Sequence, residues 1–130
     1  MPNPVRSNQV CDATITVAQV TTTDDFTITI QLLGVNGQDL TAMAVVNYYF
    51  SIAAAGTDIA AKTTDVVSCV IGTDGLLIDH DTAVIRGTLI SESDGDIDLA
   101  VEIADNKVAY FNLILPDGTI VTGDEMSYTA

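Results

Sequence analysis

The stretch TAVIRGTLISE-SDG-DIDLAVEI-ADN-KVAYFNLIL-PDG-TIVTG, residues 82–123, decides the fold class. It consists of apolar, alternating segments separated by three short polar turns, two of which contain an Asp-Gly pair. Asp-Gly between alternating segments is typical of the tight turn between antiparallel strands, because both residues tolerate the positive φ angles that such turns require. The stretch therefore predicts successive hairpin-linked strands of an antiparallel, all-β domain.

The remainder of the chain extends this pattern. Apolar residues at every second position predict strands over 13–17 and 26–32. Residues 42–52 are apolar at nearly every position, which fits a short helix or a central strand, and their β-branched and aromatic content favours the strand. We expect a loop or a single helical turn over 53–64 and an edge strand over 125–129. The eight or nine strands that result are typical of a two-sheet sandwich.

Length and composition predict one domain. The 130 residues suffice for a single core, which we place in residues 10–130. Hydrophobic residues make up 48% of the chain and aromatic residues only 5%, so the core is expected to be mainly aliphatic, with a few large members: Phe26, Phe50, Tyr110 and Phe111. Residues 1–9 are polar and contain two prolines, which predicts a flexible N-terminal arm.

The charge of the chain is strongly negative. Eighteen acidic side chains stand against four basic ones, which gives a formal net charge of -14. Binding to phosphate backbones needs clustered Lys and Arg, so this balance argues against nucleic acid and anionic membranes as partners. The sequence contains neither a signal-like apolar stretch nor a run of 18 apolar residues, and we expect synthesis in a cytoplasm without membrane insertion.

Two cysteines, Cys11 and Cys69, lie in candidate strands and could face one another. In a reducing compartment we favour two buried free thiols over a disulfide. A zinc site is disfavoured, because neither cysteine has a C-x-x-C partner and His80 is distant in sequence.

The densest acidic cluster is ESDGDID, residues 92–98, and carboxylates of this kind can bind a hard cation such as calcium. Its candidate ligands are Asp94, Asp96 and Asp98. The spacing does not match an EF-hand loop, and we favour a turn at Asp94 with Asp96 and Asp98 on the solvent face of the following strand. His80 lacks an identifiable nucleophile beside it, and the serines lie in no nucleophile motif, so we expect a protein that is not an enzyme and needs no cofactor.

Adjacent aromatic residues, Tyr48, Tyr49 and Phe50, alternate between the two faces of the predicted central strand. Either core covers both faces, or Tyr49 lies in a subunit interface, where aromatic residues are enriched.

Three motifs, IGTDGLLI at 71–78, LISESDGDIDLAVEI at 89–103 and YFNLILPDGTIVTG at 110–123, occur in an order and spacing that resembles small virion proteins of tailed bacteriophages. The resemblance covers about half of the chain. It implies an immunoglobulin-like sandwich with a structural role, such as a capsid decoration or cement protein, or an accessory fibre domain.

On this resemblance we expect a homo-oligomeric virion protein on the capsid surface, with the major capsid protein as its partner. A receptor- or carbohydrate-binding module of a fibre or tail is the alternative. The residues expected to contact the partner are those of the arm together with the exposed aromatic: Pro2, Asn3, Pro4, Val5, Arg6 and Tyr49.

Overall fold

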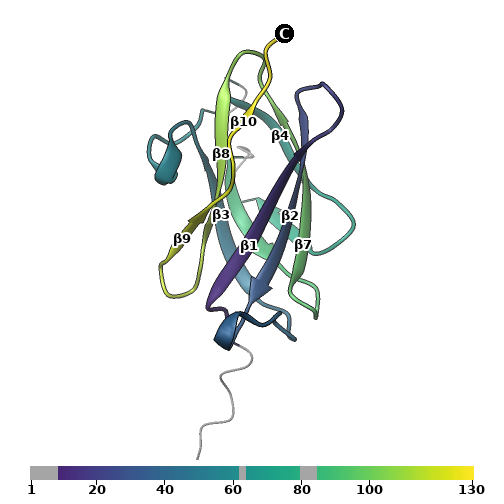
Figure 1. Cartoon of the computed structure of the whole chain (residues 1–130), viewed down its shortest axis with the longest axis vertical. Coiled ribbons are helices and arrows are strands. Elements are labelled where there is room, and N and C mark those ends of the chain that lie inside the picture. The colour runs from purple at the N-terminus through teal and green to yellow at the C-terminus, as the bar shows by residue number, and fades with distance from the viewer. Residues whose placement is uncertain (1–8, 62–63, 80–84) are drawn as a thin grey trace, which may run out of the picture.

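A computed structural model of the chain describes residues 9–61, 64–79 and 85–130. Within these ranges the chain forms ten strands and two short 3-10 turns, arranged as two facing layers (Figure 1). The elements are β1 (Asp12–Gln19), β2 (Asp25–Leu33), η2 (Val35–Gly37), β3 (Val45–Ser51), η3 (Ala54–Gly56), β4 (Val66–Ile71), β5 (Leu76–Asp79), β6 (Arg86–Ile90), β7 (Asp96–Ile103), β8 (Val108–Ile114), β9 (Ile120–Thr122) and β10 (Met126–Ser127).

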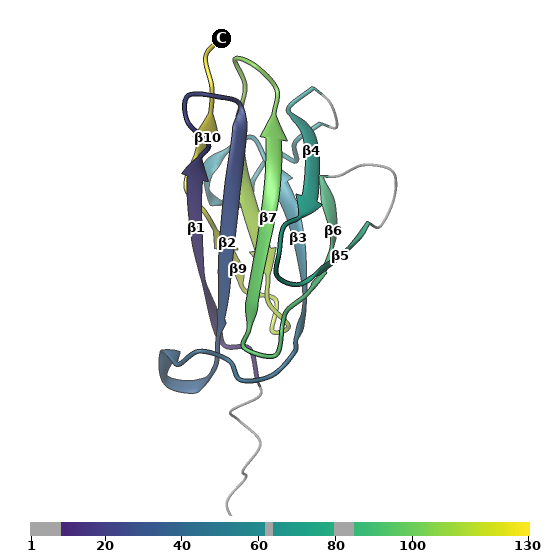
Figure 2. The same ribbon diagram turned by 90° about the vertical axis from the view of Figure 1, so that its right-hand side faces the viewer.

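The strands form two antiparallel sheets. The first sheet has four strands in the order β1-β2-β7-β4, which lie side by side in Figure 2. The second has six strands in the order β10-β8-β3-β6-β5, with β9 also paired to β8. Both β9 and β10 pair with β8, at opposite ends of that strand. The described residues thus contain ten strands, where eight or nine were expected.

The two sheets form a sandwich, as expected, and much of the strand order follows an immunoglobulin-like plan. The four-stranded sheet follows the A-B-E-D arrangement of constant-type domains, and β3, β8 and the β9/β10 pair follow the C-F-G arrangement. One feature differs from that plan. The β5-β6 hairpin enters the chain between β4 and β7 and extends the second sheet beside β3.

Two of the three turns within residues 82–123, which suggested successive hairpins, connect the two sheets instead. Strands β6, β7 and β8 follow one another in sequence, yet β6 and β8 belong to the six-stranded sheet and β7 belongs to the other sheet. The connections at 91–95 and 104–107 therefore cross from one sheet to the other, and only β8-β9 is a hairpin of the expected kind. The Asp94-Gly95 turn is present, with Gly95 at a φ of +81°, but it directs the chain across the sandwich.

The core lies between the two sheets and is mainly aliphatic, as expected. Its aromatic centre consists of Tyr48, Phe50 and Phe111, whose ring centroids are 5.5 to 5.8 Å apart. The expectation that Tyr110 belongs to this core is wrong, because Tyr110 lies on the outer face of β8 and donates a hydrogen bond to Glu125 Oε2. Tyr48, on the inner face of β3, occupies the core instead.

The ambiguous segments are resolved as the residue types favoured. Residues 45–51 form a central strand between β8 and β6, residues 54–56 form a single 3-10 turn, and residues 126–127 form an edge strand. Of the residues described, no helix is long and apolar enough to cross a membrane.

Both cysteines are free thiols, as favoured, but only Cys69 is buried. The expectation that Cys11 is buried is wrong, because it precedes β1 at one edge of the four-stranded sheet and is exposed. Cys69 lies in β4 at the opposite edge of that sheet, so the two thiols do not face one another. Burial raises the pKa of Cys69 to about 12; a hydrogen bond with Tyr48 lowers this pKa and the charge of Asp79 raises it, each by less.

Candidate docking face

Two carboxylates of the acidic cluster at 92–98, Asp94 and Asp98, accept hydrogen bonds within the fold. Asp98 projects from the outer face of β7, and its carboxylate accepts hydrogen bonds from the backbone N–H of Asp74 at 2.5 Å and from the hydroxyl of Thr73 at 3.2 Å. A Cβ atom at Gly72 would lie 2.5 Å from Asp98 Oδ2, so only glycine allows this close approach. Asp98 lies on the outer face of β7, as expected, and there it fastens the β4-β5 turn onto that strand.

The pKa values of Asp98 and Asp96 shift in opposite directions. Desolvation raises the pKa of Asp98, but the hydrogen bonds from Asp74 and Thr73 outweigh it and the net shift is downward. Asp96 has its pKa raised by desolvation and then by nearby carboxylates, Asp94 first among them. Asp94 Oδ1 accepts a hydrogen bond from the backbone N–H of Asp96 at 3.2 Å, which is a turn interaction. Among residues 9–61, 64–79 and 85–130, no group of three or more His, Cys, Asp or Glu side chains is placed to hold a metal ion.

Tyr49 lies on the outer face of β3, half-buried beneath the loop that carries η3. Its hydroxyl donates to the carbonyl oxygen of Gly56 at 2.7 Å. Beside it, the buried Asn112 donates to Ser51 Oγ at 2.9 Å and accepts from Thr122 Oγ1 at 2.7 Å. These polar side chains hold the η3 loop against the sheet, so loop and hydrogen bonds, rather than core, cover this part of β3.

Further along the same outer face, apolar side chains are bare. The strand register places Leu76, Ile90 and Val45 in one row across β5, β6 and β3. The next row contains Ile78 on β5, Ile114 on β8 and Ile120 on β9, separated by a Thr88–Asn47 hydrogen bond of 2.8 Å. Met43 lies two residues before Val45, just outside β3. We call this set the apolar face: Met43, Val45, Leu76, Ile78, Ile90, Ile114 and Ile120.

The apolar face is largely accessible to solvent. Five of its side chains are between 46% and 66% exposed, namely Met43, Val45, Leu76, Ile78 and Ile120. Single exposed apolar residues are common on protein surfaces, whereas a contiguous group marks a site of interaction. The face is therefore the strongest candidate for a functional surface in the described part of the chain.

The two outer faces of the sandwich differ sharply in charge. The outward strand positions of β1, β2 and β7 include five carboxylates: Asp12, Asp25, Asp96, Asp98 and Glu102. The outward strand positions of the six-stranded sheet, as far as the structure describes them, include none. In a chain with 18 acidic residues, the outward strand positions of this sheet thus carry no carboxylate, although Glu125 accepts a hydrogen bond from Tyr110 on it.

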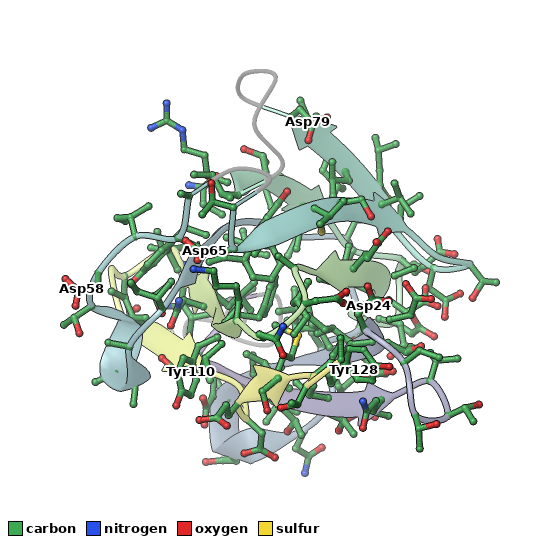
Figure 3. All side chains as sticks on the ribbon, turned by 90° about the horizontal axis from the view of Figure 1, so that it is seen from above. Asp24, Asp58, Asp65, Asp79, Tyr110 and Tyr128 are labelled. Carbon is green, nitrogen blue, oxygen red and sulfur yellow. The ribbon has the colours of Figure 1, made fainter. Side chains whose placement is uncertain are left out.

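Carboxylates lie in the turns and at a strand end near this sheet, and Arg86 stands on its outer face opposite Tyr49. Asp74 precedes Leu76 in the β4-β5 turn, Asp79 ends β5, and Asp117 lies in the turn between β8 and β9. Asp58 belongs to the η3 loop; it and Asp79 lie at the outline of the molecule in Figure 3. Hydrogen bonds from Thr119 lower the pKa of Asp117, which keeps that carboxylate charged.

A shallow hollow of about 130 Å³ lies on the opposite outer face, between β2, β4 and β7. Its exposed wall is formed by Val20, Val70 and Ala100, with Glu102 at its border. Desolvation and the nearby Asp24, Asp25 and Asp105 raise the pKa of Glu102. Asp25, Thr27 and Ser68 also line the hollow.

Comparison with known proteins gave no relative: no family model, no curated protein and no solved structure matches the chain.

The expected contact residues are placed only in part. Pro2, Asn3, Pro4, Val5 and Arg6 lie outside the described residues, as does His80. Tyr49 is described, and its hydroxyl is already bonded within the chain. The apolar face was missed, although its signal is in the sequence: residues 42–52 are apolar at outward as well as inward positions.

Proposed function

We propose that the chain is a non-enzymatic structural protein of a tailed-phage virion, a capsid decoration or cement protein. It is made in the host cytoplasm and attaches to the outside of the shell, across neighbouring copies of the major capsid protein. The motif resemblance at 71–78, 89–103 and 110–123 supports the class of protein.

One observation carries the adhesive role: the apolar face, bare and free of carboxylates on a chain whose net charge is -14. A rigid sandwich that presents such a face can bury apolar area across the joints between capsid subunits. Burial contributes roughly 25 cal/mol per Å² of apolar surface, and this gain resists separation of the subunits it bridges. The acidic remainder of the surface keeps the free protein soluble and repels the packaged nucleic acid.

Residues 1–9 belong to the same proposal as a second point of attachment. An arm of this composition contributes little to the core, so its loss should leave the melting temperature of the free protein nearly unchanged. Oligomerisation of the chain on the shell is a further part of the proposal.

Co-sedimentation with expanded shells of the phage that encodes the chain tests this function. The full chain should bind at a saturating number of copies related to the shell symmetry, and a chain lacking residues 1–9 should bind more weakly. DNA serves as the negative control. Absence of binding to shells, combined with retention on host cells or glycans, would overturn the proposal in favour of a receptor-binding module.

A further inference from the structure

We propose that the hollow between β2, β4 and β7 receives a Lys or Arg side chain of a partner protein. Its apolar wall, formed by Val20, Val70 and Ala100, takes the aliphatic stem of that side chain. Asp25 and Glu102 take its cationic head. The inference goes beyond the proposed function, because the hollow lies on the outer face of the four-stranded sheet and the apolar face lies on the other sheet.

The strand register explains why the surface is hollowed at this point. Strands β2, β7 and β4 lie side by side (Figure 2), and Ala100 of β7 stands between Thr27 of β2 and Val70 of β4. The other outward positions of β7 carry Asp or Glu, so Ala100 has the shortest side chain of that row. A short side chain between longer neighbours leaves room for a side chain from outside.

A β-bulge places a polar residue beside Glu102. The pairing of β4 with β7 shifts between Val66 and Ser68, so Val67 has no partner and Ser68 takes the position opposite Glu102. Regular pairing would place Val67 there instead. Bulges re-aim side chains in this way and are common next to active sites. Asp25 of β2 pairs with Glu102 from the other side, so one row across the sheet contains Asp25, Glu102 and Ser68.

Two carboxylates thus stand opposite one another at the border of the hollow. Like charges directly opposite on paired strands are destabilising. Desolvation, and then the negative charges of Asp24, Asp25 and Asp105, raise the pKa of Glu102. Within the part of the chain that the structure describes, no hydrogen bond reaches the carboxylates of Asp25 and Glu102 or the hydroxyl of Ser68. A cation from outside the chain relieves the repulsion and finds these oxygens ready to accept its hydrogen bonds.

The size and lining of the hollow select a side chain over other ligands. Its volume of about 130 Å³ is well below the roughly 300–1,000 Å³ of small-molecule pockets, so a single side chain fits and a whole metabolite does not. Lys and Arg combine an apolar stem with a cationic head, which matches an apolar wall bordered by carboxylates. Calcium takes about six to eight oxygen ligands, and the described residues include no group of three metal-binding side chains.

A protein other than this chain supplies the side chain. The chain has only four basic residues and a net charge of -14, so repulsion opposes the approach of a second copy to this face. A surface rich in Lys or Arg is attracted to the same face. The hollow is shallow and encloses little of a free amine, whereas a protein adds contacts on the sheet around it.

NMR titration of the full chain, followed at the methyl signals of Val20, Val70 and Ala100, tests the site. The probe is a blocked tripeptide with Lys between two Gly residues, and its norleucine twin has the stem without the ammonium group. n-Butylamine represents a free amine, and calcium chloride at equal ionic strength represents a metal ion. We expect the Lys peptide to shift all three signals saturably, with a Kd at least tenfold lower than that of the norleucine twin. Butylamine should bind at least threefold more weakly than the Lys peptide, and calcium should give no saturable shift.

One pair of variants tests the space. Ala100→Leu fills the hollow without a change of charge, and Ala18→Leu makes the same change on β1, outside the hollow. The first should bind the Lys peptide at least fivefold more weakly, and the second should stay within twofold of the unmodified chain. Should Ala100→Leu fail to fold, Val70→Ser removes apolar wall at an exposed position of β4 and should weaken binding at least threefold.

A second pair tests the charge. Asp25→Asn with Glu102→Gln neutralises the border of the hollow, and Asp12→Asn with Asp96→Asn removes the same charge from other outward positions of this sheet. We expect at least fivefold weaker binding in the first variant and a change within twofold in the second.

Several outcomes would overturn the inference. Absence of saturable shifts, or equal binding of the norleucine twin, would remove the cationic head. Butylamine binding as tightly as the Lys peptide would indicate a site for free amines, and saturation by calcium would indicate a metal site. Equal losses in the two charge variants would reduce the effect to long-range attraction. Self-association of the chain that Asp25→Asn with Glu102→Gln abolishes would identify a second copy as the partner.

The titration uses the free chain without shells, so its result is separate from that of the shell experiment. Failure of the Lys peptide to bind would leave the proposed attachment through the apolar face untouched. Failure of the chain to bind shells would overturn the proposed function, and the titration would still decide the chemistry of the hollow.

Discussion

At the scale of single residues, the structure assigns different roles to side chains that look alike in the sequence. Asp96 and Asp98 both point outward from β7, but only Asp98 receives hydrogen bonds from the β4-β5 turn. The sequence predicts their shared face from the period of the strand. It does not predict the partner of Asp98, because that partner comes from a turn 24 residues away in the chain.

Asp98→Asn should lower the free energy of unfolding at pH 7 by about 1 kcal/mol, since hydrogen bonds to a charged acceptor are replaced by weaker ones. Asp96→Asn, the matched control, should leave stability unchanged or slightly raised, because neighbouring carboxylates oppose its charge. Urea denaturation measures both. An equal effect of the two substitutions would contradict the assignment of Asp98 to the turn.

The contribution of Asp98 to the free energy of unfolding should also depend on pH. Its pKa is lower in the folded chain than its ordinary value of 3.8, so its stabilisation is present above that value and is lost as the pH falls through the folded pKa. The difference between the Asp98→Asn variant and the unmodified chain should therefore shrink below about pH 4. Urea denaturation at a series of pH values checks this, and an undiminished difference at pH 2 would contradict it.

The two thiols should differ in reactivity. Iodoacetamide at pH 8 should modify Cys11, which is exposed, and leave Cys69 intact, because its burial and raised pKa suppress the thiolate. Mass spectrometry should find one modified thiol per native chain and two per chain in denaturant. A native mass that is two protons below the reduced formula would instead reveal a disulfide.

At the scale of elements, the alternation of residues predicts most strands correctly but not the sheet to which each belongs. The Asp94-Gly95 and Asp117-Gly118 turns look equivalent in the sequence, yet one crosses between sheets and the other closes the β8-β9 hairpin. Turn residues specify the local φ angles. The pairing of the flanking strands is decided by the packing of the whole core, which a local pattern does not contain.

This difference makes the two glycines unequal. Both have positive φ, but a Cβ atom at Gly95 would lie 2.8 Å from Gln31 Nε2 and 3.1 Å from Leu32 O, whereas Gly118 has open space. Gly118→Ala should cost about 1 kcal/mol from backbone strain alone. Gly95→Ala should cost about 3 kcal/mol, because strain and steric overlap add. Thermal or urea unfolding compares them, and equal losses would contradict the packing of the 91–95 connection against β2.

At the scale of the whole molecule, the pattern of strands and turns correctly indicates an all-β sandwich and composition indicates its aliphatic core, while the structure adds the asymmetry between its two outer faces. The continuous apolar run at 42–52 predicts a central strand. The apolar pattern of this run does not reveal whether the second face of the strand is covered by the chain's own core or left exposed for a partner. Only the assembled sheet distinguishes the two, because it shows that nothing in the described chain covers Val45.

The net charge of -14 should make stability depend on salt. Repulsion among carboxylates opposes the compact state, and ions at 0.15 M screen it beyond about 8 Å. The melting temperature should rise by roughly 3–5 °C between 10 mM and 150 mM sodium chloride, which corresponds to about 1 kcal/mol for a domain of this size. An unchanged melting temperature would show that the carboxylates are too well separated to matter.

The central claim, attachment to a protein surface through the apolar face, can be tested at one residue. Met43 belongs to that face and is 66% exposed, whereas Met126 is fully buried and serves as an internal control. The measurement is the rate of oxidation by dilute hydrogen peroxide, followed by peptide mass spectrometry, for the free chain and for the chain bound to shells. We predict that Met43 oxidises rapidly in the free chain and at least fivefold more slowly on the shell, while Met126 stays slow in both. Rapid oxidation of Met43 in a chain that is demonstrably bound would contradict the claim.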